Sequence, residues 1–219
     1  AKETMILEFL QNSSQFIIPI YQRNYSWELE QCQQLWNDVI RTGDNPSGSV
    51  HFVGSIVYVA DGMSTVSLQA PLLVIDGQQR LTTITLLLEA LQRSLGETEP
   101  VEGFSAEKIK SRYLTRHLEK GEKFFKLLLS QTDDETLRSI IKEIEMPADS
   151  SSRITENFDF FVNEISKNKK SIEILCRGIA KLAIVDIALN RGEDNPQLIF
   201  ESMNSTGKAL SQADLIRNY

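Results

Sequence analysis

Cysteine and histidine are nearly absent from this chain, which contains two residues of each. Cys32 and Cys176 lie far apart and match no metal-ligand spacing, so we interpret them as single buried thiols in a reducing compartment. His51 and His117 are isolated, which argues against a histidine-ligated metal site and against a histidine-based catalytic triad. These absences lead us to expect a cytoplasmic protein.

Long hydrophobic runs are also missing. No stretch approaches the roughly 18 uninterrupted apolar residues that a membrane-spanning helix needs, and no signal peptide is recognisable. Hydrophobic residues nevertheless make up 41% of the 219 residues, enough for the core of one large domain or two small ones. We therefore expect a globular protein with no membrane partner.

Basic residues are scarce in the first part of the chain. Residues 1–90 contain only four, namely Lys2, Arg23, Arg41 and Arg80. Arg23 and Arg80 fall in unusual motifs, so we interpret them as placed for an anion. The rest of the chain mixes nineteen basic with twenty-one acidic residues, and its one local basic run lies at residues 167–170. The net charge of the whole chain is −7. Weak binding of unmodified duplex DNA at physiological salt is the expectation.

Hydrophobic periodicity predicts the order of the secondary-structure elements. The expected helices cover residues 5–10, 27–41, 81–95, 106–114, 122–129, 134–145, 154–165, 195–203 and 211–219. The expected strands cover residues 16–20, 52–60, 65–68, 72–75 and 182–189, the last rejoining the first sheet. This order predicts an α+β fold: a small mixed β-sheet with flanking helices in residues 1–98, a helical insertion in 99–179, and a return to the core in 180–219.

The most informative motif is Asp-Gly-Gln-Gln-Arg, which joins an apolar strand to a strongly apolar helix. The first N–H groups of a helix lack partners within it, and the helix dipole favours an anion beside them. Gly77 allows close backbone approach, Gln78 and Gln79 offer amide donors, and the planar fork of Arg80 fits phosphate. We interpret the turn as a phosphate site. The alternative is an ordinary strand–turn–helix junction whose polar residues, including Asp76, face water.

A second segment, Ile-Pro-Ile-Tyr-Gln-Arg-Asn-Tyr-Ser-Trp, is dense in aromatic and donor side chains. Within it Arg23 is suited to pair with phosphate, and Tyr21, Tyr25 or Trp27 to stack on a base or sugar. The alternative is that the aromatic side chains fix this loop to the core, with Ser26 capping the next helix. We assign that structural role to Ser26 and Trp27, and the ligand role to Arg23 and Tyr25.

A third segment, Asn-Ser-Thr-Gly-Lys, lies between two expected helices near the end of the chain. It places Asn204, Thr206, Gly207 and Lys208 in a turn that is typical of a backbone anion nest. Gly207 also fits a plain helix C-cap, so the segment by itself leaves both interpretations open. Together with the other two segments, it favours a phosphate clamp.

The blocks IPIYQRNYSW, IDGQQRLTT and FESMNSTGKALSQADLIRNY resemble the three signature blocks of the GmrSD-type N-terminal domain. That domain is the ParB/sulfiredoxin-like module of modification-dependent (type IV) restriction and phage-defence proteins. The resemblance spans residues 16–219 and implies nucleotide binding with metal-dependent NTP hydrolysis at the DGQQR turn. It also implies coupling to a C-terminal His-Asn-His-type nuclease. This chain contains no such module, and we interpret it as a fragment of a longer protein, so no nuclease activity is expected from it.

The resemblance and the side-chain chemistry together assign a role to each motif residue. The expected catalytic residues are Asp76, Gln78, Gln79 and Arg80. Asp76 would hold Mg²⁺ or Mn²⁺ together with the NTP, and the glutamines would orient water or bind phosphate oxygens. Arg80 and Arg23 would neutralise charge that develops on the transferred phosphoryl group. The expected phosphate-binding residues are Arg23, Tyr25, Gly77, Asn204, Thr206, Gly207 and Lys208.

Three classes of function remain open at this point. The first is an NTP-hydrolysing regulatory domain, with the triphosphate as its partner and DNA reached only through the missing nuclease module. The second is a DNA-binding or modified-DNA-sensing module without turnover, against which the acidic charge weighs. The third is an assembly domain whose motifs only cap helices, and formation of a homo-oligomer is left open. One bound phosphate chain would require Arg23, Asp76, Gln78, Arg80 and Asn204 to line a single pocket.

Overall fold

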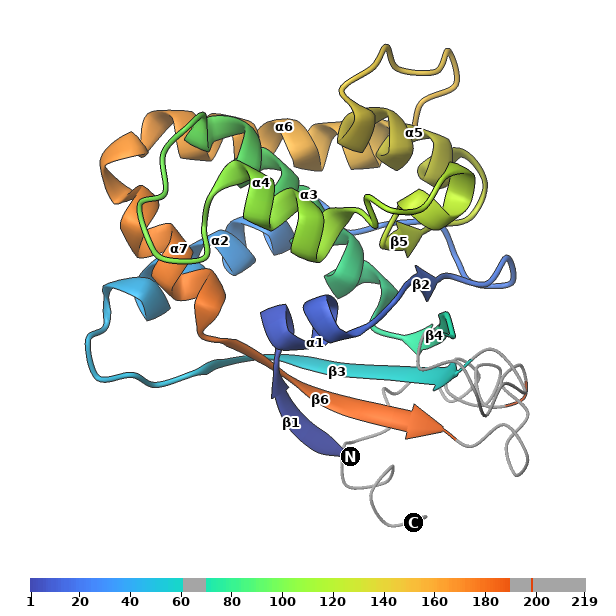
Figure 1. Ribbon diagram of the computed structural model, residues 1–219, viewed down its shortest axis with the longest axis horizontal. Helices are drawn as coiled ribbons and strands as arrows, with labels where there is room; N and C mark the ends of the chain where they lie inside the picture. The colour runs from blue at the N-terminus through green and yellow to red at the C-terminus, as the bar shows by residue number, and fades with distance from the viewer. Residues whose placement is uncertain (61–69, 190–197, 199–219) are drawn as a thin grey trace.

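In the part of the chain that the structure describes, six strands form one mixed sheet, and helices cover one of its faces (Figure 1). The computed structural model describes residues 1–60, 70–189 and 198. Within that part, the strands are β1 (Lys2–Met5), β2 (Phe16–Ile17), β3 (His51–Ala60), β4 (Leu72–Asp76), β5 (Leu127–Leu128) and β6 (Leu182–Leu189). Their order across the sheet is β1-β6-β3-β4-β2-β5. The α+β prediction with a small mixed sheet is therefore confirmed.

The centre of the sheet is built by β3 and β6, which run parallel to each other. Both strands are rich in β-branched residues, which pack well on a pleated surface. β1 pairs antiparallel with β6, and β4 pairs antiparallel with β3. β2 then lies parallel to both β4 and β5. The predicted return of residues 182–189 to the first sheet is thus confirmed.

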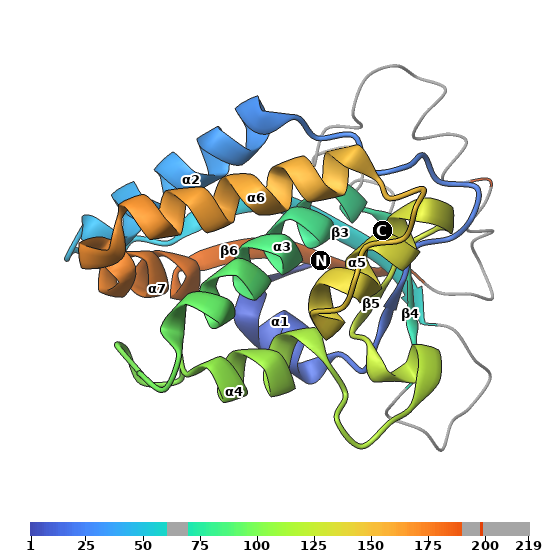
Figure 2. The ribbon, with the colours of Figure 1, turned by 90° about the horizontal axis from the view of Figure 1, so that it is seen from above.

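Seven α-helices and three short helical turns pack above this sheet in the described part of the chain (Figure 2). The helices are α1 (Ile6–Asn12), α2 (Leu29–Asp44), α3 (Gln78–Leu95), α4 (Ala106–Ile109), α5 (Gln131–Lys142), α6 (Ser152–Lys167) and α7 (Ile172–Ala180). The turns are the π-helical η1 (Lys110–Leu114) and the 3₁₀-helical η2 (Gly121–Phe124) and η3 (Lys169–Ser171).

α3 is the central helix of the layer, and fifteen of its eighteen residues are buried. A helix buried on nearly every side must bond its polar side chains internally. Thr82, Thr83 and Thr85 do so by donating their hydroxyls to the carbonyls four residues earlier, at 2.8–2.9 Å. The first turn of α3, which carries the DGQQR motif, is therefore held by a rigid core element.

The predicted elements differ from the structure at three places in the described part of the chain. A helix was expected over 122–129, but η2 ends at Phe124 and the chain continues into β5. Leu127 and Leu128 pair with Phe16 and Ile17 of β2, so backbone bonds to a distant strand override the local helical spacing. Neither β1 nor α7 was predicted from the sequence. The expected strand 65–68 and the helices 195–203 and 211–219 lie outside the described residues.

The segment 99–179, expected as a helical insertion, shares structure with the first part of the chain. It contributes β5 to the sheet, and its helix α6 packs along α3 (Figure 2). The division of the chain into a core and an insertion stays a prediction.

Glu89 is an unusual feature of α3, because this acidic side chain is fully buried. Its Oε1 accepts hydrogen bonds from Arg93 Nε at 2.8 Å and from Gln92 Nε2 at 3.1 Å. Its Oε2 has no partner among the described residues. Burial raises the pKa of Glu89 above its ordinary value of 4.5, and the bonds to Arg93 and Gln92 oppose that rise only in part.

We expect Glu89→Gln to flatten the pH dependence of the free energy of unfolding. Because the folded state holds the Glu89 proton more tightly than the unfolded state, this group's contribution is fully present below pH 4.5. That contribution is lost as the pH rises towards the folded-state pKa, and glutamine does not titrate. Urea unfolding at a series of pH values checks this, and an unchanged decline in the variant would contradict it.

Candidate functional site

The turn between β4 and α3 is built around a glycine that no other residue replaces without strain. Asp76 ends β4, and Gly77 is the N-cap of α3 with a left-handed φ of 98°. A Cβ at Gly77 would lie 3.0 Å from both Ser55 O and Ile56 Cγ1 of β3. The glycine therefore permits both the backbone turn and the close packing on β3. It leaves the first N–H groups of α3 without partners inside the helix.

Arg80, in the first turn of α3, lies across a second glycine. Its Nη1 donates to Ser55 O at 3.0 Å and lies 3.7 Å from Asp76 Oδ2. A Cβ at Gly54 would lie 2.5 Å from Arg80 Nε, and the φ of Gly54 is +119°. The absence of a side chain at Gly54 therefore leaves the space that the Arg80 guanidinium occupies, which we call its seat. The Arg80 side chain remains 30% exposed.

Sequence reasoning missed Gly54. The available signal was an isolated glycine inside a strand pattern, which often marks a bulge or a close approach. The pairing of β3 with β6 indeed shifts register between Phe52 and Ser55, on either side of that glycine.

The loop that carries Arg23 is attached to the first turn of α3 by both motif glutamines. Gln78 donates from Nε2 to Arg23 O at 2.9 Å, across 55 positions of sequence. Gln79 Oε1 accepts from the backbone N–H groups of Ser26 at 2.8 Å and Trp27 at 3.1 Å. Its Nε2 donates to the backbone carbonyl of Asn24, so both ends of the Gln79 amide are bonded to the loop. Both glutamines are buried, and their observed contacts position the loop; their catalytic roles stay predictions.

Tyr25 fixes the same loop to the core. The residue is 4% exposed, and its hydroxyl bonds Thr83 Oγ1 at 2.7 Å and accepts from Asn157 Nδ2 at 2.8 Å. Its backbone N–H donates to Asp133 Oδ2 at 2.6 Å. Burial also raises the pKa of Tyr25 above its ordinary value of 10.0. The expected stacking of Tyr25 on a base or sugar does not fit this burial, so its ligand role is corrected to a structural one.

Two further contacts in this loop were not foreseen. Gln22 donates from Nε2 to the carbonyls of Val74 and Ile75, the latter at 3.1 Å, at the end of β4. Asn157 also donates to Trp27 O at 2.8 Å, and its Oδ1 is buried without a partner among the described residues. Position 157 falls on the apolar face of α6, and an asparagine at such a position is the sequence signal that could have indicated this contact.

Arg23 itself is exposed, and no ion pair is recorded for it in the described part of the chain. The backbone bond from Gln78 places this arginine's loop directly beside the Gly77 turn and Arg80's helix. Two of the three predicted segments thus meet at the start of α3. The third, with Asn204, Thr206, Gly207 and Lys208, lies outside the described residues, so a shared pocket stays a prediction on that side.

Asp76 is the one carboxylate of the DGQQR turn, and its side chain is 43% exposed. The described residues contain no group of three His, Cys, Asp or Glu side chains that could hold a metal ion. Magnesium often takes only one or two carboxylates and completes its shell with phosphate oxygens and water. Asp76 therefore suits a metal that arrives with a phosphate ligand, and not a metal held by protein side chains alone.

Among the described helices, none is long and apolar enough to span a membrane.

The model of the family described as GmrSD restriction endonuclease, N-terminal domain, matches residues 6–219, a range that includes all three motif segments. No curated protein matches the chain.

Proposed function

The chain belongs to the GmrSD restriction endonuclease N-terminal domain family, and from this premise we propose that it binds a nucleoside triphosphate at the β4–α3 turn and hydrolyses it. The family membership supports a role in a restriction or phage-defence system. Within such a system, the domain would act as the regulatory part that responds to the nucleotide. DNA cleavage is not proposed for this chain.

The observation that carries this proposal is the meeting of two arginine-bearing segments at the open end of a buried helix. Gln78 bonds the exposed Arg23 loop to the turn, and Gly54 seats Arg80 beside Asp76. The N-terminus of a helix favours an anion, and arginine forks match phosphate oxygens. Because the turn rests on a nearly fully buried helix, Arg80 and the first N–H groups of α3 are held in place before any ligand arrives.

In the proposed reaction, the residues of this turn mainly position and neutralise charge. Gly77 admits the phosphates close to the backbone, while Arg80 and Arg23 stabilise charge that develops on the transferred phosphoryl group. Asp76 would hold Mg²⁺ or Mn²⁺, which when bound supplies further neutralisation of the phosphate oxygens. Gln78 and Gln79 keep the Arg23 loop in register.

The proposal also includes a second set of phosphate ligands. Asn204, Thr206, Gly207 and Lys208, which lie outside the described residues, would contribute further contacts to the phosphates.

We expect Arg23→Ala to weaken NTP binding by about tenfold or more, because it removes one charge-assisted contact to phosphate. A titration of each fluorescent NTP analogue in the presence of Mg²⁺, together with a phosphate-release assay, measures this. Arg41→Ala is the matched control, since Arg41 is an exposed arginine on α2 that pairs with Asp38. Equal affinities for the two variants would contradict the role of Arg23. Absence of binding for all four NTPs, with Mg²⁺ and with Mn²⁺, would overturn the proposed function.

A further inference from the structure

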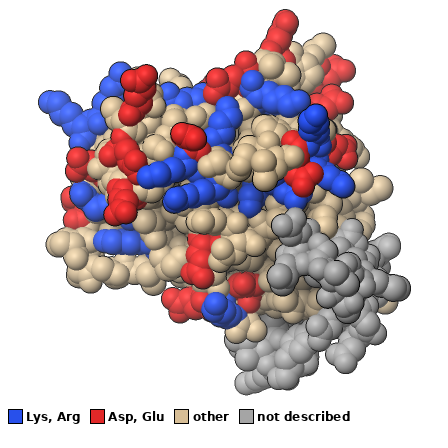
Figure 3. Space-filling view, in the orientation of Figure 1, with Lys and Arg blue, Asp and Glu red and all other residues tan. Residues whose placement is uncertain are grey.

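A basic segment runs through η1 and η2, although the whole chain is acidic. Residues 108–126 contain seven lysines and arginines and two glutamates, in a chain of net charge −7. The basic residues are Lys108, Lys110, Arg112, Arg116, Lys120, Lys123 and Lys126. They are spaced along the sequence, so they form no local run. Figure 3 shows lysine and arginine side chains in a band across the face that carries α4 and η1.

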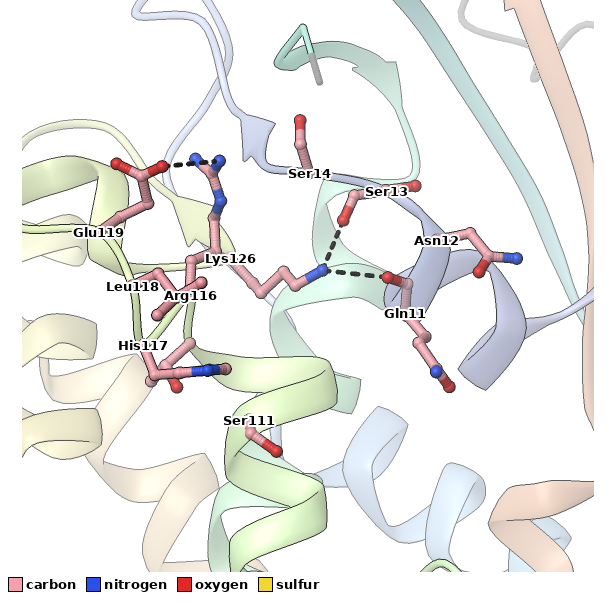
Figure 4. A pocket seen from close by; sticks show the side chains of 11 residues that line it. Gln11, Asn12, Ser13, Ser14, Ser111, Arg116, His117, Leu118, Glu119 and Lys126 are labelled. Carbon is pink, nitrogen blue, oxygen red and sulfur yellow. Dashed lines mark hydrogen bonds and ion pairs between the residues drawn. The ribbon is translucent and has the colours of Figure 1, made fainter. Parts of the chain in front are cut away.

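A cavity of about 300 Å³ lies within this segment, between the end of α1 and the loop that follows η1. Its polar lining includes Ser13 and Ser14 on one side and Arg116 and His117 on the other, with Lys126 between them (Figure 4). None of these residues belongs to the β4–α3 turn. The cavity is therefore separate from the proposed nucleotide site.

Lys126 brings a buried positive charge to this cavity. The side chain is 8% exposed, and its amine donates to the carbonyls of Leu10 at 3.0 Å, Gln11 at 3.3 Å and Ser13, which closes the end of α1. No carboxylate lies within ion-pair distance of it among the described residues. Burial, and after it the charge of Arg116, lowers the pKa of Lys126 to about 8. Lys126 thus brings a positive charge to the cavity wall without an acidic partner of its own, and the one carboxylate that lines the cavity, Glu119, pairs with Arg116 instead.

The amine of Lys126 already donates to three backbone carbonyls, so Arg116 has to supply the hydrogen-bond donors for a ligand. Its one recorded carboxylate partner, Glu119, lies at 3.6 Å and is 40% exposed, so this ion pair is weak. Its Nη1 makes a long bond of 3.4 Å to Lys123 O. The Arg116 side chain is 16% exposed, and its guanidinium keeps further N–H groups for a ligand, with His117 exposed beside it. A planar fork next to an uncompensated ammonium matches phosphate in shape and charge.

We propose that the cavity between α1 and the loop after η1 binds a phosphate group through Arg116, with Lys126 supplying charge and His117 a further donor. The group belongs either to a free phosphate or to the phosphodiester backbone of a nucleic acid, since both present the same oxygens.

Backbone-amide NMR of the chain tests this site, with sodium phosphate as the probe and sodium chloride at matched ionic strength as the reference. Phosphate should shift the amides of Ser13, Ser14 and residues 116–119 with saturation, and chloride should not. Arg116→Gln should raise the Kd by about tenfold or more, because a charge-assisted bond is lost. Arg112→Gln removes the same charge from the same segment outside the cavity, and should stay within about twofold.

A short DNA duplex distinguishes the two sources of the phosphate group. If the DNA duplex shifts these amides with saturation and inorganic phosphate does not, the ligand is a phosphodiester backbone. If inorganic phosphate shifts them, the ligand is a free phosphate. Shifts at residues 77–80 report the nucleotide site, so either proposal can fail by itself. If Arg116→Gln does not fold, His117→Gln, at an exposed position, serves as the second variant. Equal effects of phosphate and chloride, or equal Kd values for the Arg116 and Arg112 variants, would overturn the inference.

Discussion

Arg80→Ala is expected to lower the kcat of NTP hydrolysis by about a thousandfold. An arginine that stabilises the transition-state charge of phosphoryl transfer is worth roughly 10³–10⁵ in rate. The structure holds the Arg80 guanidinium beside the turn by one bond to Ser55 O, a neighbouring Asp76 carboxylate and the Gly54 seat. Release of phosphate from NTP under saturating nucleotide measures the effect.

Two controls separate a catalytic Arg80 from a merely structural one. The side chain makes one recorded hydrogen bond and is 30% exposed, so its loss should cost only about 1 kcal/mol of folding free energy. Arg80→Lys keeps the charge without the planar fork and should recover only part of the rate. Hydrolysis at the wild-type rate in Arg80→Ala, or unfolding of that variant, would sink the catalytic assignment.

Gly54→Ala should impair both folding and hydrolysis. The backbone of Gly54 has a φ of +119°, where an L side chain is strained by about 1–3 kcal/mol. The new Cβ would also lie 2.5 Å from Arg80 Nε and 2.8 Å from its Cζ, so the guanidinium must leave its seat. We therefore expect a lower urea midpoint together with a loss of kcat that approaches the loss in Arg80→Ala.

Gly48→Ala is the matched control for this prediction. Gly48 also has a positive φ, of +74°, but nothing lies within 4 Å of the position of its Cβ. The control should show the strain in its urea midpoint and keep the wild-type kcat. A Gly54→Ala variant that hydrolyses NTP normally would show that the seat of Arg80 is unrelated to the reaction.

Much of the fold was predictable because it depends on local patterns. The apolar spacing of residues 81–95 predicted the long helix, which the structure extends by one turn to Gln78. The β-branched runs of β3 and β6 predicted two strands of one sheet. For the same reason the sequence located the turn at Gly77, where the apolar strand changes to a helical pattern. The family assignment likewise followed from motif order and is confirmed by the match over residues 6–219.

The interior of the site was less predictable, because hydrogen bonds between distant segments leave no periodic trace. Tyr25 was expected to stack on a base or sugar, yet its hydroxyl bonds Thr83 and Asn157, which lie 58 and 132 positions away in the sequence. Gln79 looked like a ligand for phosphate, yet its amide holds the loop backbone. A polar side chain has the same composition whether it faces a ligand or a carbonyl, and only the fold decides which it meets.

The sequence by itself determined the α+β class, the central helix α3 and the position of its DGQQR turn, since these arise from residue spacing within one element. Tertiary structure alone decided that Gly54 seats Arg80, that β5 joins β2, and that Arg116 and Lys126 share a cavity. Each of these depends on which segments lie side by side, and that choice is made by burial and backbone pairing over the whole chain rather than by neighbours in sequence.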